Sequence, residues 1–430
     1  MLNLPCKLAE LEKKGEIIKV AVVGMGHMGA GVATVISMIK GMDVLALASL
    51  NKEKAIGIFE EIGVLRKDIF YSSNNPDECN RALKKGMRVV TDKAEIIPNL
   101  FPLDAIVEAT GVPRVGAKIA LEAIRKKKHV IMMNVETDVT VGYILSELAK
   151  NAGVVYTVGA GDEPGAIKEL YDFAKCLSLK IVAAGKGKNN PLDREATPDS
   201  LKDAAFKKGV SPRMLTEFVD GSKTMIEMSV VANATNLVPD VRGMHGPSCN
   251  LSQISSVFTL KEKGGILNQE GVVDYALGEI APGVFVVATT QNKRLRKDLE
   301  YIGMGKGPNY LLYRPYHLIS MEIPISVARA VIYQEPTIVS SGKPIAETIT
   351  VAKRNLKKGK TIDGIGGFDV YGLIEKADVT QEENFLPLGL AEEAVLKNDV
   401  KKGDYITLDQ VEFEEESILV SLRKLQDNLS

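Results

Sequence analysis

The sequence predicts an α/β protein with an N-terminal doubly wound parallel sheet, a central α+β domain and a small C-terminal β-rich module. The chain has 430 residues, 45% of them hydrophobic and 25% charged, so it is globular and too long for one hydrophobic core. Up to about residue 160, apolar strands alternate with helical segments of about 10 to 15 residues. Beyond residue 161 this alternation stops, and from about residue 351 short β segments follow one another.

Residues 1–160 contain the alternating pattern. The apolar run Val20–Val23 enters a glycine-rich turn, and the next segment has helical spacing up to Gly41. Such βαβ units predict a parallel sheet with helices on both faces. The other expected strands and helices are DVLALAS, DAIVEATG, KIALEAIRKKK, HVIMM, VGYILSELAKNAG and VVYTVGAG.

The rest of the chain predicts two further domains. Residues 161–350 mix a helix (EPGAIKELYDFAKCL), a polar loop and short strands such as GVFVVATT, which suits an α+β substrate and dimerisation domain. In residues 351–430, the Lys-Lys-Gly turns at Lys357–Gly359 and Lys401–Gly403 each close a short β segment. The final stretch predicts an amphipathic helix with Glu at its start and basic residues near its end.

Charge and cysteine content exclude several classes of protein. Lys plus Arg number 54 against 55 Asp plus Glu, so no bulk charge attracts nucleic acid or a membrane surface. We therefore expect a small-molecule substrate and a homodimer or higher homo-oligomer. No signal peptide or membrane span is evident, which predicts a cytoplasmic protein. The four cysteines lack metal-site or disulfide spacing.

A glycine motif between the first strand and the first helix predicts cofactor binding. Residues 24–31 read GxGxxGxG, the fingerprint of a Rossmann dinucleotide-binding domain. The glycines allow a tight turn, close approach of the pyrophosphate and close packing of helix on strand. The expected cofactor contacts here are Gly24, Gly26, His27, Met28 and Gly29.

The end of the second strand predicts NADP(H) rather than NAD. An acidic residue at this position binds the ribose 2′-hydroxyl of NAD. Ser49, Asn51 and Lys52 stand there instead, and Glu53 comes too late. A hydroxyl, an amide and an ammonium suit a 2′-phosphate.

Two further strand ends should face the cofactor, because ligands bind at the carboxyl ends of parallel strands. DAIVEATG ends at Thr110 and Gly111, although an ordinary strand-ending glycine is an equal alternative. HVIMM is followed by Asn134, Glu136 and Asp138, an abrupt change from apolar to polar. We expect Asn134 to contact the cofactor and Glu136 to act in catalysis.

The candidate substrate groups follow the next two strands. Asp162 and Glu163 could hold a divalent cation, Mg²⁺ or Mn²⁺, or Glu163 could be the acidic first turn of a helix. Lys186 and Lys188, in a glycine-flanked loop, could bind an anionic substrate or transfer protons with a lowered pKa, or lie on a solvated surface. Asn233, a further candidate catalytic residue, lies in the middle of a helix, which suggests a ligand or a buried hydrogen-bond partner. His245 is as consistent with a loop as with a catalyst.

These motifs resemble the homoserine-dehydrogenase-like oxidoreductases that carry a C-terminal SAF domain. The glycine fingerprint, VEATG, KHVIMMNVE and GAGDEPGA carry the likeness, and the segment from about Val351 to Val411 is similar to the SAF module. One branch is the second type of 1-deoxy-D-xylulose 5-phosphate reductoisomerase, an enzyme of isoprenoid biosynthesis. It makes 2-C-methyl-D-erythritol 4-phosphate with NADPH and a divalent cation.

The resemblance implies roles for several residues. Lys186 and Lys188 would bind the phosphate or transfer protons, and the carboxylates would hold the cation. Val135 and Glu136 stand where homoserine dehydrogenases carry a lysine soon after the Asn, and their NGTxNYIL signature is absent, which argues against homoserine oxidation. The resemblance thus implies a reductoisomerase that acts on 1-deoxy-D-xylulose 5-phosphate or a similar small keto-sugar phosphate. A homoserine-dehydrogenase-like, polyol or hydroxy-acid dehydrogenase and a dinucleotide-binding regulatory protein are the alternatives, since one fold hosts many functions.

Overall fold

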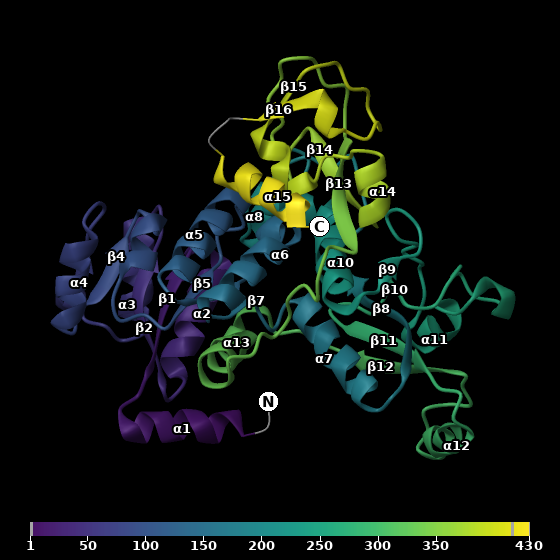
Figure 1. The fold of residues 1–430 in the computed structure, drawn as a ribbon, viewed down its shortest axis with the longest axis horizontal. Coiled ribbons are helices and arrows are strands. Elements are labelled where there is room, and N and C mark those ends of the chain that lie inside the picture. Colours follow the sequence, from purple (N-terminus) through teal and green to yellow (C-terminus); the bar gives the residue numbers. More distant parts are fainter. Residues whose placement is uncertain (1–2, 414–416, 430) are drawn as a thin grey trace. The chain divides into compact units, whose positions relative to one another are not determined.

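The computed structural model describes residues 3–413 and 417–429, which form two compact units (Figure 1). The first unit contains the N-terminal residues up to Asp162 together with Leu318–Val339 and Ser421–Asn428. The second contains Glu163–His317 and Ser340–Val420. This division differs from three consecutive domains, because the chain returns twice to the first unit and the β-rich segment joins the second.

The first unit is built on a seven-stranded parallel sheet, which confirms the predicted doubly wound α/β fold. Its strand order is β3-β4-β2-β1-β5-β6-β7. The strands are β1 (Ile18–Val23), β2 (Met42–Ala48), β3 (Ile69–Tyr71), β4 (Arg88–Thr91), β5 (Ala105–Glu108), β6 (His129–Met132) and β7 (Tyr156–Val158). The helices are α1 (Leu4–Lys14), α2 (His27–Met38), α3 (Lys52–Glu61), α4 (Pro76–Lys84), α5 (Pro113–Arg125), α6 (Val135–Ala152) and α13 (Ile323–Ala328).

The topology places the glycine motif at the point where the strand order reverses. β1 pairs in parallel with β2 on one side and with β5 on the other. The chain builds one half of the sheet outward from β1 and then the other half from β5, which opens a crevice beyond the carboxyl end of β1. The β1 side chains are apolar apart from Lys19, and almost all are buried, as expected for a strand covered on both faces.

The segment Leu318–Val339 packs against the last strand of this sheet. The backbone N–H of Val158 donates to the carbonyl of Ile338 at 2.9 Å, and that of Ala160 donates to the Ser326 hydroxyl at 2.8 Å. Gly159 allows the contact, because a Cβ there would lie 2.3 Å from the Cδ1 of Ile323. The edge of the sheet at β7 is thereby covered.

The second unit contains a five-stranded mixed sheet and a β-rich segment. The sheet has the order β12-β11-β8-β10-β9. Its strands are β8 (Lys180–Lys188), β9 (Val238–Pro239), β10 (Val272–Leu277), β11 (Val284–Thr289) and β12 (Asn309–Arg314). The helices are α7 (Glu163–Cys176), α8 (Lys202–Lys208), α9 (Pro212–Val219), α10 (Ser222–Thr235), α11 (Ile254–Val257) and α12 (Lys293–Tyr301).

Strand β8 extends to Lys188, so the expected polar loop is wrong for residues 185–188, whereas residues 189–200 form no helix or strand. β8 lies between β10, its parallel neighbour, and β11, its antiparallel neighbour. Its glycines serve close packing within the sheet. A Cβ at Gly185 would lie 2.1 Å from the carbonyl oxygen of Asp274, and one at Gly187 would lie 2.2 Å from the backbone nitrogen of Ala281.

The β-rich segment consists of two antiparallel pairs, β13 (Ala346–Ala352) with β14 (Val370–Lys376) and β15 (Ala394–Leu396) with β16 (Val411–Phe413), and helix α14 (Ala377–Glu382). Ile349 and Leu373 share one hydrophobic cluster with Met225 and Met228 of α10, so this segment and the central sheet have a common core. The final helix is α15 (Ile418–Leu429), and the expected Glu residues at 414–416 lie outside the described residues.

The structure shows no membrane-spanning helix within residues 3–413 and 417–429. None of the helices in these ranges is both long enough and apolar enough to cross a bilayer.

Candidate functional site

The loop after β1 has the geometry that a dinucleotide pyrophosphate requires. Gly24 has a φ of 96°, and a Cβ there would lie 2.6 Å from the carbonyl oxygen of Ala109. A Cβ at Gly29 would lie 1.9 Å from the carbonyl oxygen of Gly24, so each position requires glycine. Gly26 caps the N-terminus of α2 and has open space where a Cβ would be. The backbone N–H groups of His27 and Met28 begin this helix, which favours an anion.

The predicted NADP-discriminating residues lie together after β2. Asn51 caps α3 by accepting from the Lys54 N–H at 3.2 Å, and the Ser49 hydroxyl accepts from the Asn51 N–H at 3.2 Å. The ammonium of Lys52 lies 4.8 Å from the centre of the Tyr71 ring. Asn51 and Lys52 are exposed.

The acidic residue nearest to this loop has a different partner. Glu53, on α3, forms an ion pair with Arg66 at 2.8 Å, so its carboxylate already has a partner within the protein. The group of Ser49, Asn51 and Lys52 therefore offers a hydroxyl, an amide and a cation to a ligand.

The ends of β5 and β6 form a buried polar cluster. Glu108 accepts from the Thr110 N–H at 2.9 Å through Oε1, while its Oε2 is buried with no hydrogen-bond partner among the described residues. Burial raises the pKa of Glu108 to about 7. The Asn134 amide accepts from the Thr137 N–H at 3.0 Å and donates to the Val112 carbonyl at 3.1 Å. Gly111, with a φ of 69°, lies in the turn between β5 and α5.

The polar residues after β6 belong to the first turns of α6. Asn134 is the N-cap of this helix, and Glu136 is buried in the first turn. Asp138 accepts a hydrogen bond from the Tyr156 hydroxyl at 3.0 Å, and burial raises its pKa to about 7. Helix capping therefore explains the abrupt change from apolar to polar in the sequence.

The second unit brings Lys186 of β8 between two carboxylates. Its ammonium donates to Glu163, the first residue of α7, and to Glu227 of α10. Only 8% of the Lys186 side chain and 2% of the Glu227 side chain are exposed. Helices α7 and α10 pack side by side and α7 covers β8, which brings the three residues together. Glu163 therefore begins helix α7, as one of the two sequence predictions stated. It also belongs to the cluster, because it accepts from Lys186.

The electrostatics of this cluster correct one expectation. The two carboxylates outweigh the effect of burial and raise the pKa of Lys186, so the lowered pKa that the glycine-flanked pattern allowed is wrong. Lys186 is therefore a permanent cation. Two carboxylates share one ammonium, so one negative charge is in excess, and burial raises the pKa of Glu227 to about 7.

Lys188 lies two residues further along β8, on the same face of the strand as Lys186. Its ammonium donates to the main-chain carbonyl of Phe218 at 2.6 Å. Burial, helped by the charge of Lys186, lowers the pKa of Lys188 to about 8. Both lysines are buried, which excludes the solvated-surface alternative for them.

Glu163 also lies near the imidazole of His317, which the sequence did not predict as a site residue. The Nε2 of His317 is 3.6 Å from Oε1 of Glu163. A carboxylate suits Mg²⁺ and Mn²⁺, whereas an imidazole suits softer divalent ions such as Fe²⁺ or Zn²⁺, so the fit to Mg²⁺ or Mn²⁺ comes from the Glu163 carboxylate. Asp162, the other predicted ligand, precedes Glu163 in the chain and is the last residue of the first stretch of the first unit.

Two other candidates lie outside the Lys186 cluster. The Asn233 amide accepts from the backbone N–H groups of Ile345 and Ala346 at 2.7 and 2.9 Å and donates to the Ala346 carbonyl at 3.1 Å. Asn233 thus joins α10 to β13, and its amide has buried hydrogen-bond partners within the protein, which is one of the two alternatives that the sequence offered. The Nδ1 of His245 bonds Asp274 at 2.8 Å.

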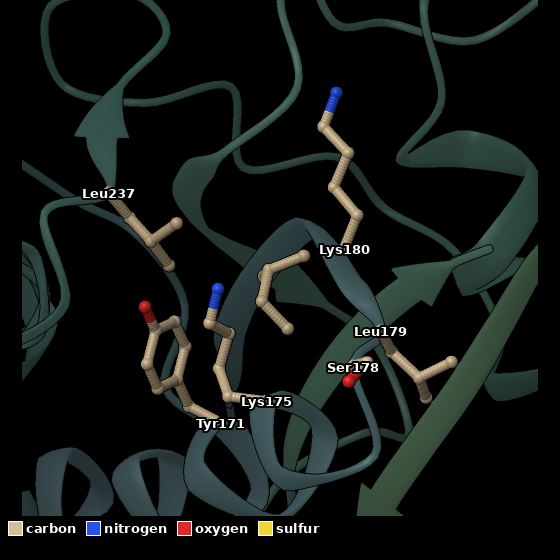
Figure 2. Close-up of a pocket in the computed structure, with 7 residues that line it drawn as sticks. Tyr171, Lys175, Ser178, Leu179, Lys180 and Leu237 are labelled. Atoms are coloured by element: carbon tan, nitrogen blue, oxygen red, sulfur yellow. The ribbon is translucent and has the colours of Figure 1, made fainter. Parts of the chain in front are cut away.

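A shallow pocket of about 500 Å³ lies at the opposite end of β8 (Figure 2). Its Tyr171 hydroxyl donates to the Thr235 carbonyl at 3.1 Å, and Lys180 pairs with Glu270 at 2.7 Å. Six residues of strand, roughly 20 Å, separate Lys180 from Lys186, so this pocket is not the lysine–carboxylate cluster. Its lining residues are Tyr171, Lys175, Ser178, Leu179, Lys180, Ile181 and Leu237.

A family model matches the part of the chain that carries this cluster. Residues 161–323 match the model described as "Oxidoreductase DRL, catalytic domain". The range includes Glu163, Lys186, Glu227 and His317. Together with the glycine loop of the first unit, the match indicates an NAD(P)-dependent oxidoreductase.

Several solved structures are similar at low identity. A probable dehydrogenase from Thermotoga maritima is 13% identical with a TM-score of 0.42, over 75% of this chain and 91% of that chain. A scyllo-inositol dehydrogenase from Lactobacillus casei, with bound NAD(H) and scyllo-inositol, is 15% identical with a TM-score of 0.39, over 69% and 76%. A DOX-P reductoisomerase with fosmidomycin and magnesium is 13% identical with a TM-score of 0.40, over 76% and 72%. Similarity at this level carries no argument about the substrate, and no curated protein matches the sequence.

Proposed function

We propose that the protein is an NADPH-dependent reductoisomerase of a small keto-sugar phosphate, with 1-deoxy-D-xylulose 5-phosphate as the favoured substrate. The observation that carries the proposal is the buried cluster of Lys186, Glu163 and Glu227, with Lys188 beside it on the same strand face. A reductoisomerase must bind an anionic phosphate, move a hydroxyl proton and polarise a carbonyl. This cluster contains a group suited to each task.

Lys188 is the group suited to the anionic end of the substrate. Its ammonium has one hydrogen bond, to a neutral main-chain carbonyl, so N–H donors are left for a phosphate oxygen. A phosphate that binds here also restores the charge of Lys188, because an adjacent anion raises the pKa of an ammonium.

Lys186 is suited to polarising a substrate carbonyl, and Glu227 is suited to the proton transfers. Lys186 uses two of its three N–H donors on carboxylates, and the third would donate to a substrate carbonyl oxygen. Glu227 has a pKa of about 7, so near neutral pH it is ionised in part of the molecules and protonated in the others. It can therefore take a proton from a substrate hydroxyl and return it later.

The residues present suit a bound cofactor and a divalent cation. The glycine loop with His27 and Met28 would hold the pyrophosphate, Ser49, Asn51 and Lys52 the 2′-phosphate, and Thr110, Gly111 and Asn134 would lie near the remainder of the cofactor. The carboxylates of Asp162 and Glu163 would hold Mg²⁺ or Mn²⁺, and Glu136 is proposed to assist catalysis. When bound, NADPH supplies hydride and the cation polarises substrate oxygens.

Turnover of 1-deoxy-D-xylulose 5-phosphate by the purified protein tests the proposal. We expect consumption of NADPH that requires Mg²⁺ or Mn²⁺, stops with a chelator and yields 2-C-methyl-D-erythritol 4-phosphate by mass spectrometry. Oxidation of a polyol or hydroxy acid, without turnover of any keto-sugar phosphate, would instead support a simple dehydrogenase. Binding of NADPH without turnover of any substrate in a broad screen would support a regulatory protein.

A further inference from the structure

Lys353, in the β-rich segment, occupies an unusual position for a lysine. It follows β13, and only 2% of its side chain is exposed. Its ammonium forms an ion pair with Asp220 at 2.8 Å and donates to the main-chain carbonyls of Ala196 and Gly367, each at 2.9 Å. An ammonium has three N–H donors, so these three partners use all of them. Lys353 is thus fixed within the protein and has no donor left for a ligand.

Asp220 is the residue through which Lys353 would influence Lys188. Asp220 follows α9, two residues beyond Phe218, whose carbonyl accepts the hydrogen bond from Lys188. The Asp220 side chain is fully buried. Both of its oxygens face other partners, because Oδ1 accepts from the Ser222 N–H at 2.8 Å and Oδ2 faces Lys353.

We propose that Lys353 is a positioning residue for anion binding: it neutralises Asp220 and thereby keeps the nearby ammonium of Lys188 available to an anionic substrate. The proposal rests on Lys188 as the anion-binding group of the proposed function. It also assigns a task to the β-rich segment, which supplies the counter-ion of a carboxylate buried beside the site.

The charges around Lys188 support this assignment. Lys186, Asp220 and Glu227 are the charged groups that act on Lys188, and Lys353 acts through Asp220. Lys186 is already shared by two carboxylates. With Lys353 present, Asp220 and its partner cancel. Burial raises the pKa of Asp220, and the charge of Lys353 opposes that rise. Without Lys353, the site gains one uncompensated negative charge wherever Asp220 is ionised, which attracts the ammonium of Lys188 and repels an incoming phosphate.

The backbone after Asp220 also holds this carboxylate, through the Ser222 N–H. Ser222, whose N–H binds Asp220, also accepts through its hydroxyl from the Gly372 N–H of β14 at 2.9 Å. The β-rich segment therefore holds both sides of this carboxylate, one through the Lys353 ammonium and the other through Ser222.

The test measures the titration of Lys188 directly. Isotope-labelled lysine in the full chain, with the Lys188 signal assigned from Lys188→Arg, gives its pKa by NMR without any substrate. We expect Lys353→Met to raise the Lys188 pKa by about one unit, a tenfold change in the proton equilibrium, and to weaken binding of inorganic phosphate to a similar extent. Lys353→Arg should keep the wild-type values, because it keeps the charge.

Two further variants keep the proposal falsifiable if Lys353→Met folds poorly. The double variant Lys353→Met with Asp220→Asn removes both charges and should restore the wild-type Lys188 pKa and phosphate affinity. Lys357→Met, which removes an exposed lysine paired with Asp399 in the same segment, is the matched control and should change neither value. An unchanged Lys188 pKa in Lys353→Met, or a double variant that keeps an altered pKa, would overturn the proposal. The Lys188 pKa and the phosphate affinity are both measured without turnover. Failure of the reductoisomerase assay therefore does not affect these two measurements.

Discussion

Lys186 and Glu227 form an ion pair whose two side chains are almost completely buried, with 8% and 2% of their surface exposed. Glu163 binds the same ammonium, so the cluster contains two carboxylates for one cation. A buried cluster with an excess negative charge holds a proton near neutral pH, which is the property that general acid–base catalysis needs. This property makes Glu227 the residue whose change is most informative.

The first prediction concerns Glu227→Gln, which keeps the size of the side chain and removes its titration. We expect kcat to fall by about 10²- to 10⁴-fold, the usual contribution of a general acid or base. We expect wild-type kcat to show an inflection near pH 7, because burial raises the pKa of Glu227 to about 7, and this inflection should disappear in the variant. Steady-state rates across pH measure both effects. Asp172→Asn, on the exposed side of α7, is the control, and an unchanged kcat in Glu227→Gln would exclude Glu227 from the chemistry.

The second prediction compares two glycine-to-alanine changes in the first unit. A Cβ at Gly29 would lie 1.9 Å from the Gly24 carbonyl oxygen, whereas Gly57, in α3, has no neighbour within 4 Å of that position. Gly29→Ala should displace the cofactor loop and weaken NADPH binding at least tenfold in a fluorescence titration. Gly57→Ala should leave binding unchanged and stabilise the helix by about 0.5–1 kcal/mol. Equal NADPH affinity in the two variants would contradict the role of this loop.

The third prediction tests the preference for NADPH. Lys52 is exposed beside Ser49 and Asn51, where a 2′-phosphate would lie, and Lys52→Glu replaces the attraction with repulsion. The ratio of kcat/KM for NADPH to that for NADH should fall at least tenfold, about 1.4 kcal/mol. Lys54→Glu makes the same change of charge two residues further along α3 and should alter the ratio much less. A wild-type enzyme that prefers NADH would refute the assignment itself.

Much of the fold was predictable because its signals are local. The buried strands and the GxGxxGxG motif lie next to each other in the chain, and they fix the parallel sheet and its cofactor loop. The extension of β8 was not predictable in this way. Gly185 and Gly187 look like loop residues, and only the neighbouring strands show that their missing side chains allow close packing. The return of Leu318–Val339 to the first unit likewise depends on contacts with β7 that are remote in sequence.

The site was predictable only in part. Lys186 and Lys188 were found from their glycine-flanked pattern, but the partners that set their charge come from other elements. One feature of the sequence could have indicated Glu227. It is the single acidic residue in SKTMIEMSVVANAT, a helix that is otherwise almost entirely buried. His317 had no such feature, since it lies 154 positions from Glu163 in the chain and comes near it only in the fold.

The last prediction uses the buried pair of Asp138 and Tyr156 to link pH to stability. Burial raises the pKa of Asp138 from 3.8 to about 7, so the folded chain holds this proton more tightly than the unfolded chain. The resulting stabilisation is complete below the unfolded pKa and is lost as the pH rises through the folded pKa. Between about pH 5 and about pH 8, this group should cost the wild-type protein on the order of 3 kcal/mol.

Asp138→Asn separates this effect from ordinary packing, because asparagine cannot ionise but keeps an oxygen that accepts from the Tyr156 hydroxyl. The variant should lose less stability than wild type between about pH 5 and about pH 8, as measured by urea denaturation at both values. Some dependence should remain, because burial also raises the pKa values of Glu108 and Glu227 to about 7. Asp77→Asn, an exposed change in α4, is the control. The same pH dependence in Asp138→Asn as in wild type would mean that Asp138 ionises freely in the folded protein.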